Sequence, residues 1–86
     1  MTDALTQRIK NFIMEEFLPG ENPDELTETT PLISGGILDS IATLKLVMFM
    51  EEEYGVSFAP HEVDKENLDD LAKIARLLQS KNPRVA

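Results

Sequence analysis

The sequence predicts an all-α fold: a small four-helix bundle with three long helices, one short helix and a long loop between the first and second. Apolar residues recur at helical spacing in three stretches, near residues 3–17, 39–54 and 68–80. Glycine or proline follows each stretch, as is usual where helices end. With 86 residues the chain has enough length for one core, so we expect a single domain over 1–86.

The first stretch, residues 3–17, is stopped by Pro19-Gly20. Its apolar residues are Leu5, Ile9, Phe12, Ile13 and Phe17. A long connection, 18–38, leads to the second helix, and connections of this length in small domains are usually functional or folded back onto the body. Within it, Asn22-Pro23-Asp24-Glu25 predicts the cap and first turn of a short helix.

The second stretch, residues 39–54, has more apolar residues than one helical face can hold. One stripe consists of Leu46, Val47, Met50 and Tyr54, and a second, displaced stripe consists of Ile41, Leu44 and Met48. A helix packed on one side would expose the second stripe, fringed by Lys45, Glu51 and Glu52, as a partner-binding patch with a charged rim. A central helix buried on both sides is the alternative, and periodicity alone does not separate the two.

Less regular sequence follows Gly55, which we expect to end the second helix in a left-handed conformation. The next residues are expected to be extended, and a short helix over 60–64 is expected to start at Pro60. The last helix, 68–80, should be capped by Asn67 or Asp69.

The charge and composition of the chain limit the classes of partner that it is expected to bind. Sixteen acidic and eight basic residues give a net charge of −8, which repels nucleic acids and anionic membranes and favours basic partners. The longest apolar run is too short to span a bilayer, and the N-terminus lacks a signal sequence. We therefore expect a cytoplasmic monomer with no membrane insertion. The absence of cysteine rules out thiolate ligands, and no metal site is expected.

Ser40 is the residue to which the sequence most strongly assigns a function. The approach Gly35-Gly36-Ile37-Leu38-Asp39 delivers it to the start of the second helix. There, unpaired backbone N–H groups and the helix dipole favour a phosphate ester on its hydroxyl. Helix capping is the commoner role for such a serine. A hydrolase using His61 is disfavoured because no Gly-x-Ser-x-Gly elbow precedes the serine, and no catalytic residue is assigned.

The sequence around Ser40 resembles the acyl and peptidyl carrier proteins. The resemblance rests on Gly35-Gly36-Ile37-Leu38-Asp39-Ser40-Ile41, Leu46-Val47-Met48 and Glu51-Glu52-Glu53-Tyr54-Gly55-Val56, and it covers nearly the whole chain. It implies that a phosphopantetheinyl transferase esterifies Ser40 with 4′-phosphopantetheine from coenzyme A. The thiol of that arm would carry an acyl or aminoacyl group as a thioester. The chain would then not be an enzyme, because other enzymes modify and load it.

The same resemblance implies a docking surface for acyl or aminoacyl ligases and for downstream synthases or transferases. Asp39 would help to orient the transferase and the arm, and the surface itself would consist of Ile41, Leu44, Lys45, Met48, Glu51 and Glu52. Ala42 and Lys45 stand where carriers of fatty acid synthesis usually have acids. This departure favours a discrete carrier in a specialised pathway, such as polyketide, nonribosomal peptide or modified acyl-group assembly.

A second function class remains open. An acidic helical adaptor could bind a partner through the stripe Ile41, Leu44 and Met48 and never carry a substrate. Replacement of Ser40 by alanine separates the two hypotheses, because a carrier would lose its substrate and an adaptor would keep its partner.

Overall fold

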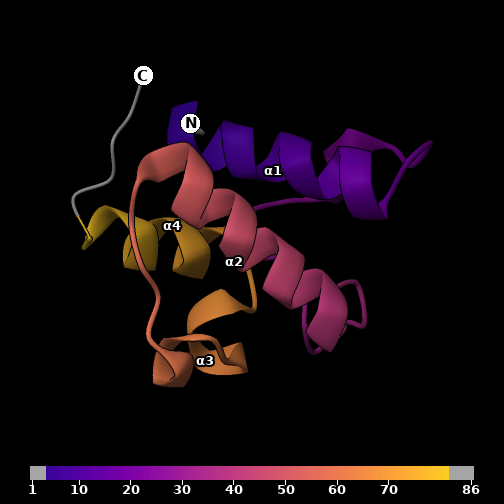
Figure 1. Cartoon of the computed structure of the whole chain (residues 1–86). Coiled ribbons are helices and arrows are strands. Elements are labelled where there is room, and N and C mark those ends of the chain that lie inside the picture. Colours follow the sequence, from indigo (N-terminus) through magenta and orange to yellow (C-terminus); the bar gives the residue numbers. More distant parts are fainter. Residues whose placement is uncertain (1–3, 82–86) are drawn as a thin grey trace.

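The structure, a computed structural model that describes residues 4–81, is helical throughout its regular elements (Figure 1). The three longer helices are α1 (Ala4–Phe17), α2 (Ser40–Tyr54) and α4 (Leu71–Gln79), and α3 (Lys65–Leu68) is a single turn. Two 3₁₀ turns, η1 (Pro23–Glu25) and η2 (Pro60–Glu62), lie in the connections. The predicted all-α, four-helix fold is confirmed.

Helix α2 begins and ends for local reasons that are visible in the sequence. Asp39 is extended, and its carboxylate accepts a hydrogen bond from the Ala42 backbone N–H at 2.7 Å, which caps the helix. Gly55 has φ of 66°, the left-handed conformation that glycine adopts without strain, and its N–H bonds to the Glu51 carbonyl. The capped start fixes the position of Ser40, the first helical residue.

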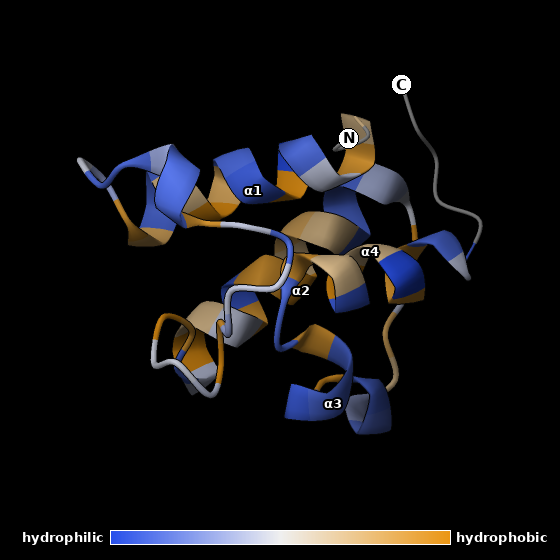
Figure 2. Cartoon of the chain, turned by 180° about the vertical axis from the view of Figure 1, so that it is seen from behind, coloured by the Kyte–Doolittle hydropathy of each residue, from blue (hydrophilic) through white to orange (hydrophobic). Residues whose placement is uncertain are grey.

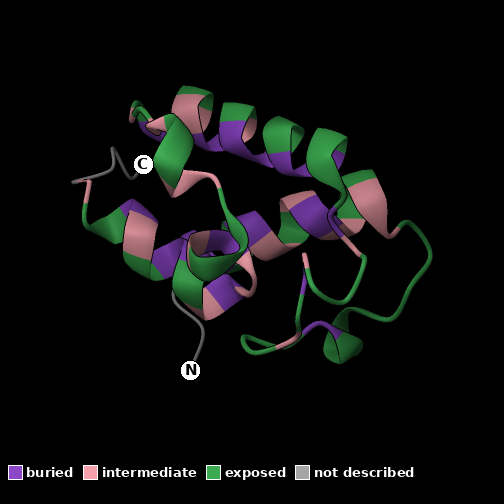
Figure 3. Cartoon of the chain, turned by 90° about the horizontal axis from the view of Figure 1, so that it is seen from below, coloured by how far each residue is buried: buried purple, intermediate pink, exposed green. Residues whose placement is uncertain are grey.

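One apolar core joins the helices. Helix α1 packs against α2 and α4, and α3 packs against α4. Figure 2 shows the hydrophobic faces turned toward the middle of the molecule, and Figure 3 shows that buried positions follow the same faces. The fully buried side chains with the largest volumes are Ile9, Ile13, Leu32, Leu38, Leu46, Met50, Leu68, Leu71, Ile74 and Leu78. This packing holds α2 in place along one side only.

The long connection between α1 and α2 folds back onto the body, as expected. Leu32 and Leu38 are buried in the core, and the Leu38 N–H bonds to the Leu32 carbonyl at 2.9 Å. The Leu32 N–H donates to the Asp69 carbonyl, and the Ala72 N–H donates to the Glu28 carbonyl at 3.1 Å. The connection is therefore bonded to the junction between α3 and α4, far away in the sequence.

The region after α2 differs from the expectation. The helix expected over 60–64 is a three-residue 3₁₀ turn, and the short α-helix is α3 instead. The Glu62 carboxylate accepts bonds from the Ala59 N–H and Lys81 Nζ, which closes the turn. Asp64 has an extended backbone, so the turn η2 does not continue into α3. Its carboxylate caps α3 by accepting a hydrogen bond from the Asn67 N–H.

The last helix also starts later than the expected 68–80. It begins at Leu71 and is capped by Asp70, not by Asn67 or Asp69. Asp69 cannot serve as the cap because its carboxylate is bonded to the connection before α2. Within residues 4–81, no helix combines the length and apolar character needed to cross a bilayer.

Candidate functional site

Ser40 is exposed at the first residue of α2. The capping bond to the Ala42 N–H comes from the neighbouring Asp39 carboxylate, so the helix does not use the serine as its cap. Among the residues that the structure describes, none forms a hydrogen bond with the Ser40 hydroxyl. The hydroxyl is thus accessible and has no structural task.

The start of α2 favours an anion on that hydroxyl. The helix has 15 residues, and its first-turn N–H groups and dipole present partial positive charge at this end. Thr43 supports the turn, because its backbone N–H and its Oγ1 both donate to the Asp39 carbonyl, at 2.9 and 2.8 Å. A phosphodiester on Ser40 therefore fits the residues present there.

A hydrogen-bonded clamp fixes the loop that leads to Ser40. The Asp69 carboxylate accepts bonds from the Ile33 N–H at 2.9 Å, the Ser34 N–H at 2.8 Å and Ser34 Oγ at 2.8 Å. These bonds, with the Ser34 N–H bond as the largest cause, lower the pKa of Asp69 below its ordinary value of 3.8. Sequence reasoning missed this role, because several neighbouring acids are equally able to cap helices.

Two glycines let the clamped loop turn closely. A Cβ on Gly35 would collide with the Pro31 carbonyl oxygen. Gly36 has φ of 84°, in the left-handed region that L side chains rarely adopt. The glycine-rich approach is therefore needed for the path of the chain toward Ser40.

The outer face of α2 settles the question that periodicity left open. Ile41, Leu44 and Met48 are 67, 56 and 53% exposed, whereas the other stripe is buried. The helix is packed on one side, so the reading in which both stripes are buried is wrong. We call Ile41, Leu44 and Met48 the outer stripe. It begins beside Ser40 and runs along the helix.

Charged residues surround the outer stripe unevenly. Lys45 and Glu52 are exposed, as a rim requires. Glu51 is half-buried, and its carboxylate accepts a hydrogen bond from the Phe58 N–H at 2.9 Å, which ties the segment after α2 to the helix. Ala42 is buried, so a carboxylate at that position would lose part of its contact with water. Of the acids expected in the rim, Glu51 has a structural bond that the sequence did not indicate.

His61 lies exposed in η2, and no hydrogen bond joins it to Ser40 among the described residues. A serine–histidine pair is therefore not formed. Nor do histidines and acids of residues 4–81 gather in a group of three or more suited to a metal ion.

Comparisons with known proteins identify a family. Residues 13–77 match the family described as phosphopantetheine attachment site. The chain is 35% identical over 75 residues to the probable acyl carrier protein PigG of Serratia sp., covering 87% of this chain and 85% of PigG. It is 34% identical over 65 residues to an acyl carrier protein of Zymomonas mobilis subsp. mobilis, covering 76% of this chain and 80% of that protein.

A solved structure is also similar. A chain of the structure titled "Crystal structure of FAD-dependent dehydrogenase" superposes with a TM-score of 0.74 at 34% identity, covering 81% of this chain and 97% of that chain. The chain described here belongs to the acyl carrier protein family, with its phosphopantetheine attachment domain. Members of this family are carriers and not catalysts, and the family implies a phosphopantetheine prosthetic group.

Proposed function

We propose that Ser40 is the attachment residue for 4′-phosphopantetheine, transferred from coenzyme A by a separate phosphopantetheinyl transferase. The observation that carries this proposal is the accessible, unbonded hydroxyl of Ser40 at the start of α2, with Asp39 in the capping role. When bound, the group supplies a thiol that holds an acyl or aminoacyl cargo as a thioester. The chain itself supplies the hydroxyl, the positive helix end and the surface that partners recognise.

The docking surface of the proposal is the outer stripe with Asp39, Lys45 and Glu52. Exposed apolar residues beside the attachment point give partner enzymes a small area to desolvate. Small interfaces bind weakly, and weak binding suits a carrier that must visit several enzymes in turn. Glu51 belongs to this surface only at its edge, because its carboxylate is engaged with Phe58.

The pathway we propose is a specialised one, in the cytoplasm, with a ligase that loads the carrier and enzymes that modify the cargo on it. Lys45 at the outer stripe and buried Ala42 distinguish this surface from an all-acid one. The similar solved chain is nearly fully covered and is of carrier size, although its structure is titled for an FAD-dependent dehydrogenase. This supports a flavin-dependent dehydrogenase as one class of partner.

One observation still favours the adaptor hypothesis: the exposed outer stripe could bind a partner protein whether or not Ser40 is modified. It does not explain why a serine without a structural task stands at the positive end of α2. The carrier proposal explains both features, and we favour it for that reason.

The test is intact-protein mass spectrometry after incubation with coenzyme A and a broad-specificity phosphopantetheinyl transferase. We expect the mass to rise by one phosphopantetheine group. Ser40→Ala should show no rise, while the matched variant Ser57→Ala, at another exposed serine, should be modified like the wild type. If wild-type protein of intact fold gains no mass, the adaptor hypothesis replaces the carrier.

A further inference from the structure

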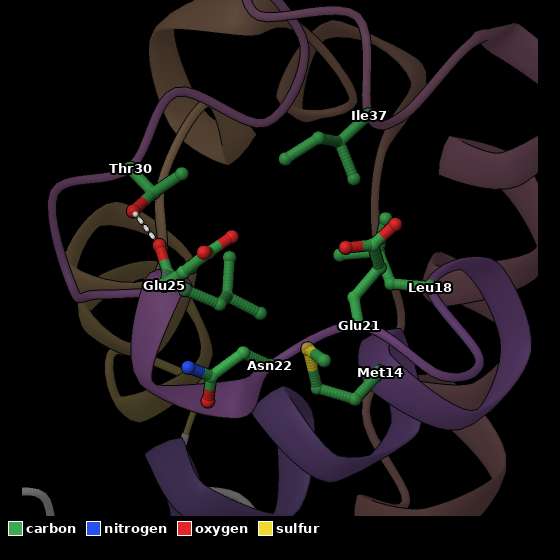
Figure 4. Close-up of a pocket in the computed structure, with 8 residues that line it drawn as sticks. Met14, Leu18, Glu21, Asn22, Glu25, Thr30 and Ile37 are labelled. Atoms are coloured by element: carbon green, nitrogen blue, oxygen red, sulfur yellow. Dashed lines mark hydrogen bonds between the residues drawn. The ribbon is translucent and has the colours of Figure 1, made fainter.

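Side-chain packing holds the loop before Ser40 only in part. We call residues 33–37 the approach loop. Leu32 before it and Leu38 after it are buried, whereas none of its own residues is fully buried. Ile37 is half-buried and lines a hollow of about 160 Å³, so its contact with α1 and η1 is incomplete (Figure 4). Other interactions must therefore fix the approach loop, which is followed by Leu38, Asp39 and then Ser40.

Hydrogen bonds supply this constraint, and one carboxylate accepts them. Among the described residues, every hydrogen bond between the approach loop and another part of the chain goes to the side chain of Asp69. The donors are the Ile33 N–H at 2.9 Å, the Ser34 N–H at 2.8 Å and Ser34 Oγ at 2.8 Å. Hydrogen bonds to an ionised acceptor are stronger than those between neutral groups. Asp69 is therefore the main anchor of the approach loop.

Asp69 is itself firmly held. It lies between α3 and α4, directly after the fully buried Leu68 and directly before Asp70, whose carboxylate caps α4. Its backbone carbonyl accepts the Leu32 N–H, so the main chain and the side chain of this one residue both bind the connection between α1 and α2. The junction of α3 and α4 thus gives the approach loop a fixed reference point.

A displacement of the approach loop reaches Ser40 through two residues. The Leu38 N–H is bonded to the Leu32 carbonyl at 2.9 Å. Asp39 must keep its extended backbone for its carboxylate to accept the Ala42 N–H at 2.7 Å. Loss of that capping bond destabilises the first turn of the helix, in which Ser40 is the first residue. The Asp69 bonds therefore support the cap, and the cap holds the residue that carries the hydroxyl.

We propose that Asp69 is a positioning residue for the modification of Ser40, which acts through the approach loop and the Asp39 cap. The inference rests on the carrier function proposed above and gives it a determinant in a distant segment of the chain. In the transfer, the Ser40 oxygen forms a bond to the phosphorus beside the pantetheine and the pyrophosphate bond of coenzyme A breaks. The adenosine bisphosphate leaves, and the hydroxyl proton passes to a base of the transferase.

The rate of such an attack depends on where the nucleophile is held, and a misplacement of about 1 Å can slow a reaction strongly. The outer stripe, by which the transferase would dock, lies outside the path from Asp69 to Ser40. Loss of the Asp69 bonds should therefore lower kcat and leave KM nearly unchanged, because it disturbs the reacting group and not the binding of the carrier.

The test measures kcat and KM for modification of the carrier by a broad-specificity phosphopantetheinyl transferase with coenzyme A. We expect Asp69→Ala to lower kcat about tenfold with little change in KM. Asp69→Asn should recover most of kcat, because its amide oxygen still accepts the two N–H bonds of the approach loop. Amide hydrogen exchange should be faster at Ile33, Ser34 and Ala42 in the alanine variant than in the wild type.

The matched control is Glu62→Ala. The Glu62 carboxylate also accepts a backbone N–H, from Ala59 at 2.8 Å, and it bonds Lys81 Nζ at 2.7 Å, but it has no bond to the approach loop. We expect this variant to lose stability and to keep the wild-type kcat. An equal loss of kcat in Glu62→Ala and Asp69→Ala would overturn the inference, because the slowing would then follow stability and not the position of the loop.

Circular dichroism confirms that each variant is folded under the assay conditions. A folded Asp69→Ala with the wild-type kcat, or with a raised KM alone, would also overturn the inference. If Asp69→Ala does not fold, Ser34→Ala replaces it, since it removes only the Ser34 Oγ bond, and its kcat should fall by a smaller factor. A wild-type kcat in Ser34→Ala would then reject the positioning role. Wild-type protein that gains no phosphopantetheine contradicts the carrier function itself.

Discussion

Asp39 caps α2, and this leaves the neighbouring Ser40 for the proposed attachment of the prosthetic group. Serine and aspartate both cap helices well, so the sequence alone allowed Ser40 to be a structural residue. In the structure the Asp39 carboxylate takes the capping bond, and the adjacent hydroxyl is left exposed. The position of Ser40 was predictable from the sequence, but its availability depends on which neighbour caps the helix.

Asp69 is the residue through which pH should act on the loop before Ser40. Its folded pKa is lowered, so its stabilising bonds are fully present above its ordinary value of 3.8 and are lost as the pH falls through the folded value. We expect Asp69→Asn to lower the thermal midpoint at pH 7. The difference from the wild type should shrink as the pH falls below about 4.

Circular dichroism measures this difference by following the thermal unfolding of both proteins at pH values from about 2.5 to 7, a span that brackets the carboxyl range. A gap between wild type and variant that stays constant over the whole range would show that the Asp69 charge does not hold the Ile33–Ser34 loop.

The side-chain roles of Asp69 and Glu51 could not be read from the sequence, for a shared reason. Each carboxylate accepts bonds from backbone N–H groups of another segment, Asp69 from Ile33 and Ser34 and Glu51 from Phe58. Local spacing carries no information on such partners. Both acids therefore resembled caps or rim charges until the tertiary structure placed them.

At the scale of elements, α2 gives the clearest prediction, because its two methionines differ in burial. Met48 is 53% exposed and Met50 is fully buried. We expect Met50→Ala to lower the free energy of unfolding by about 2–5 kcal/mol, because it leaves a cavity. Met48→Ala should change it by less than about 0.5 kcal/mol. Urea unfolding of the two variants provides the comparison, and comparable losses would mean that the outer stripe is part of the core.

Helices α1 and α2 and the turn η1 with its Asn22 cap were predictable from the sequence, and helix α3 was not. Helices α1 and α2 carry several apolar positions at helical spacing, and glycine or proline marks their ends. Helix α3 has four residues and buries only Leu68, which is too little for a periodic signal. Asp64, Asn67, Asp69 and Asp70 can all cap a helix. Asp64 and Asp70 are the caps in the structure, whereas the Asp69 carboxylate is engaged by tertiary bonds to Ile33 and Ser34.

At the scale of the whole molecule, the charge of −8 should steer basic partner enzymes toward the carrier. We expect Glu52→Lys to slow modification by the transferase several-fold at low salt and much less at high salt, because salt screens exposed charges. The rate of modification, measured at a limiting concentration of the carrier, reports this effect. Glu51 is unsuited to the test, since its replacement would also remove the bond to Phe58.

The control for steering is Glu16→Lys, which changes the net charge by the same amount from the exposed face of α1. If the charge next to the outer stripe matters, Glu52→Lys should slow modification more than Glu16→Lys. Equal slowing by both would assign the effect to net charge, and no salt dependence in either would remove steering from the mechanism.

The central claim is that Ser40 alone carries the prosthetic group, and fragment-ion mass spectrometry of the modified wild-type protein tests it most directly. The account predicts that the added phosphopantetheine mass is found on fragments that contain Ser40 and is absent from those that contain only Ser34, Ser57 or Ser80. Mass on any of those other serines would contradict the assignment of the site, even though the family of the chain would stand.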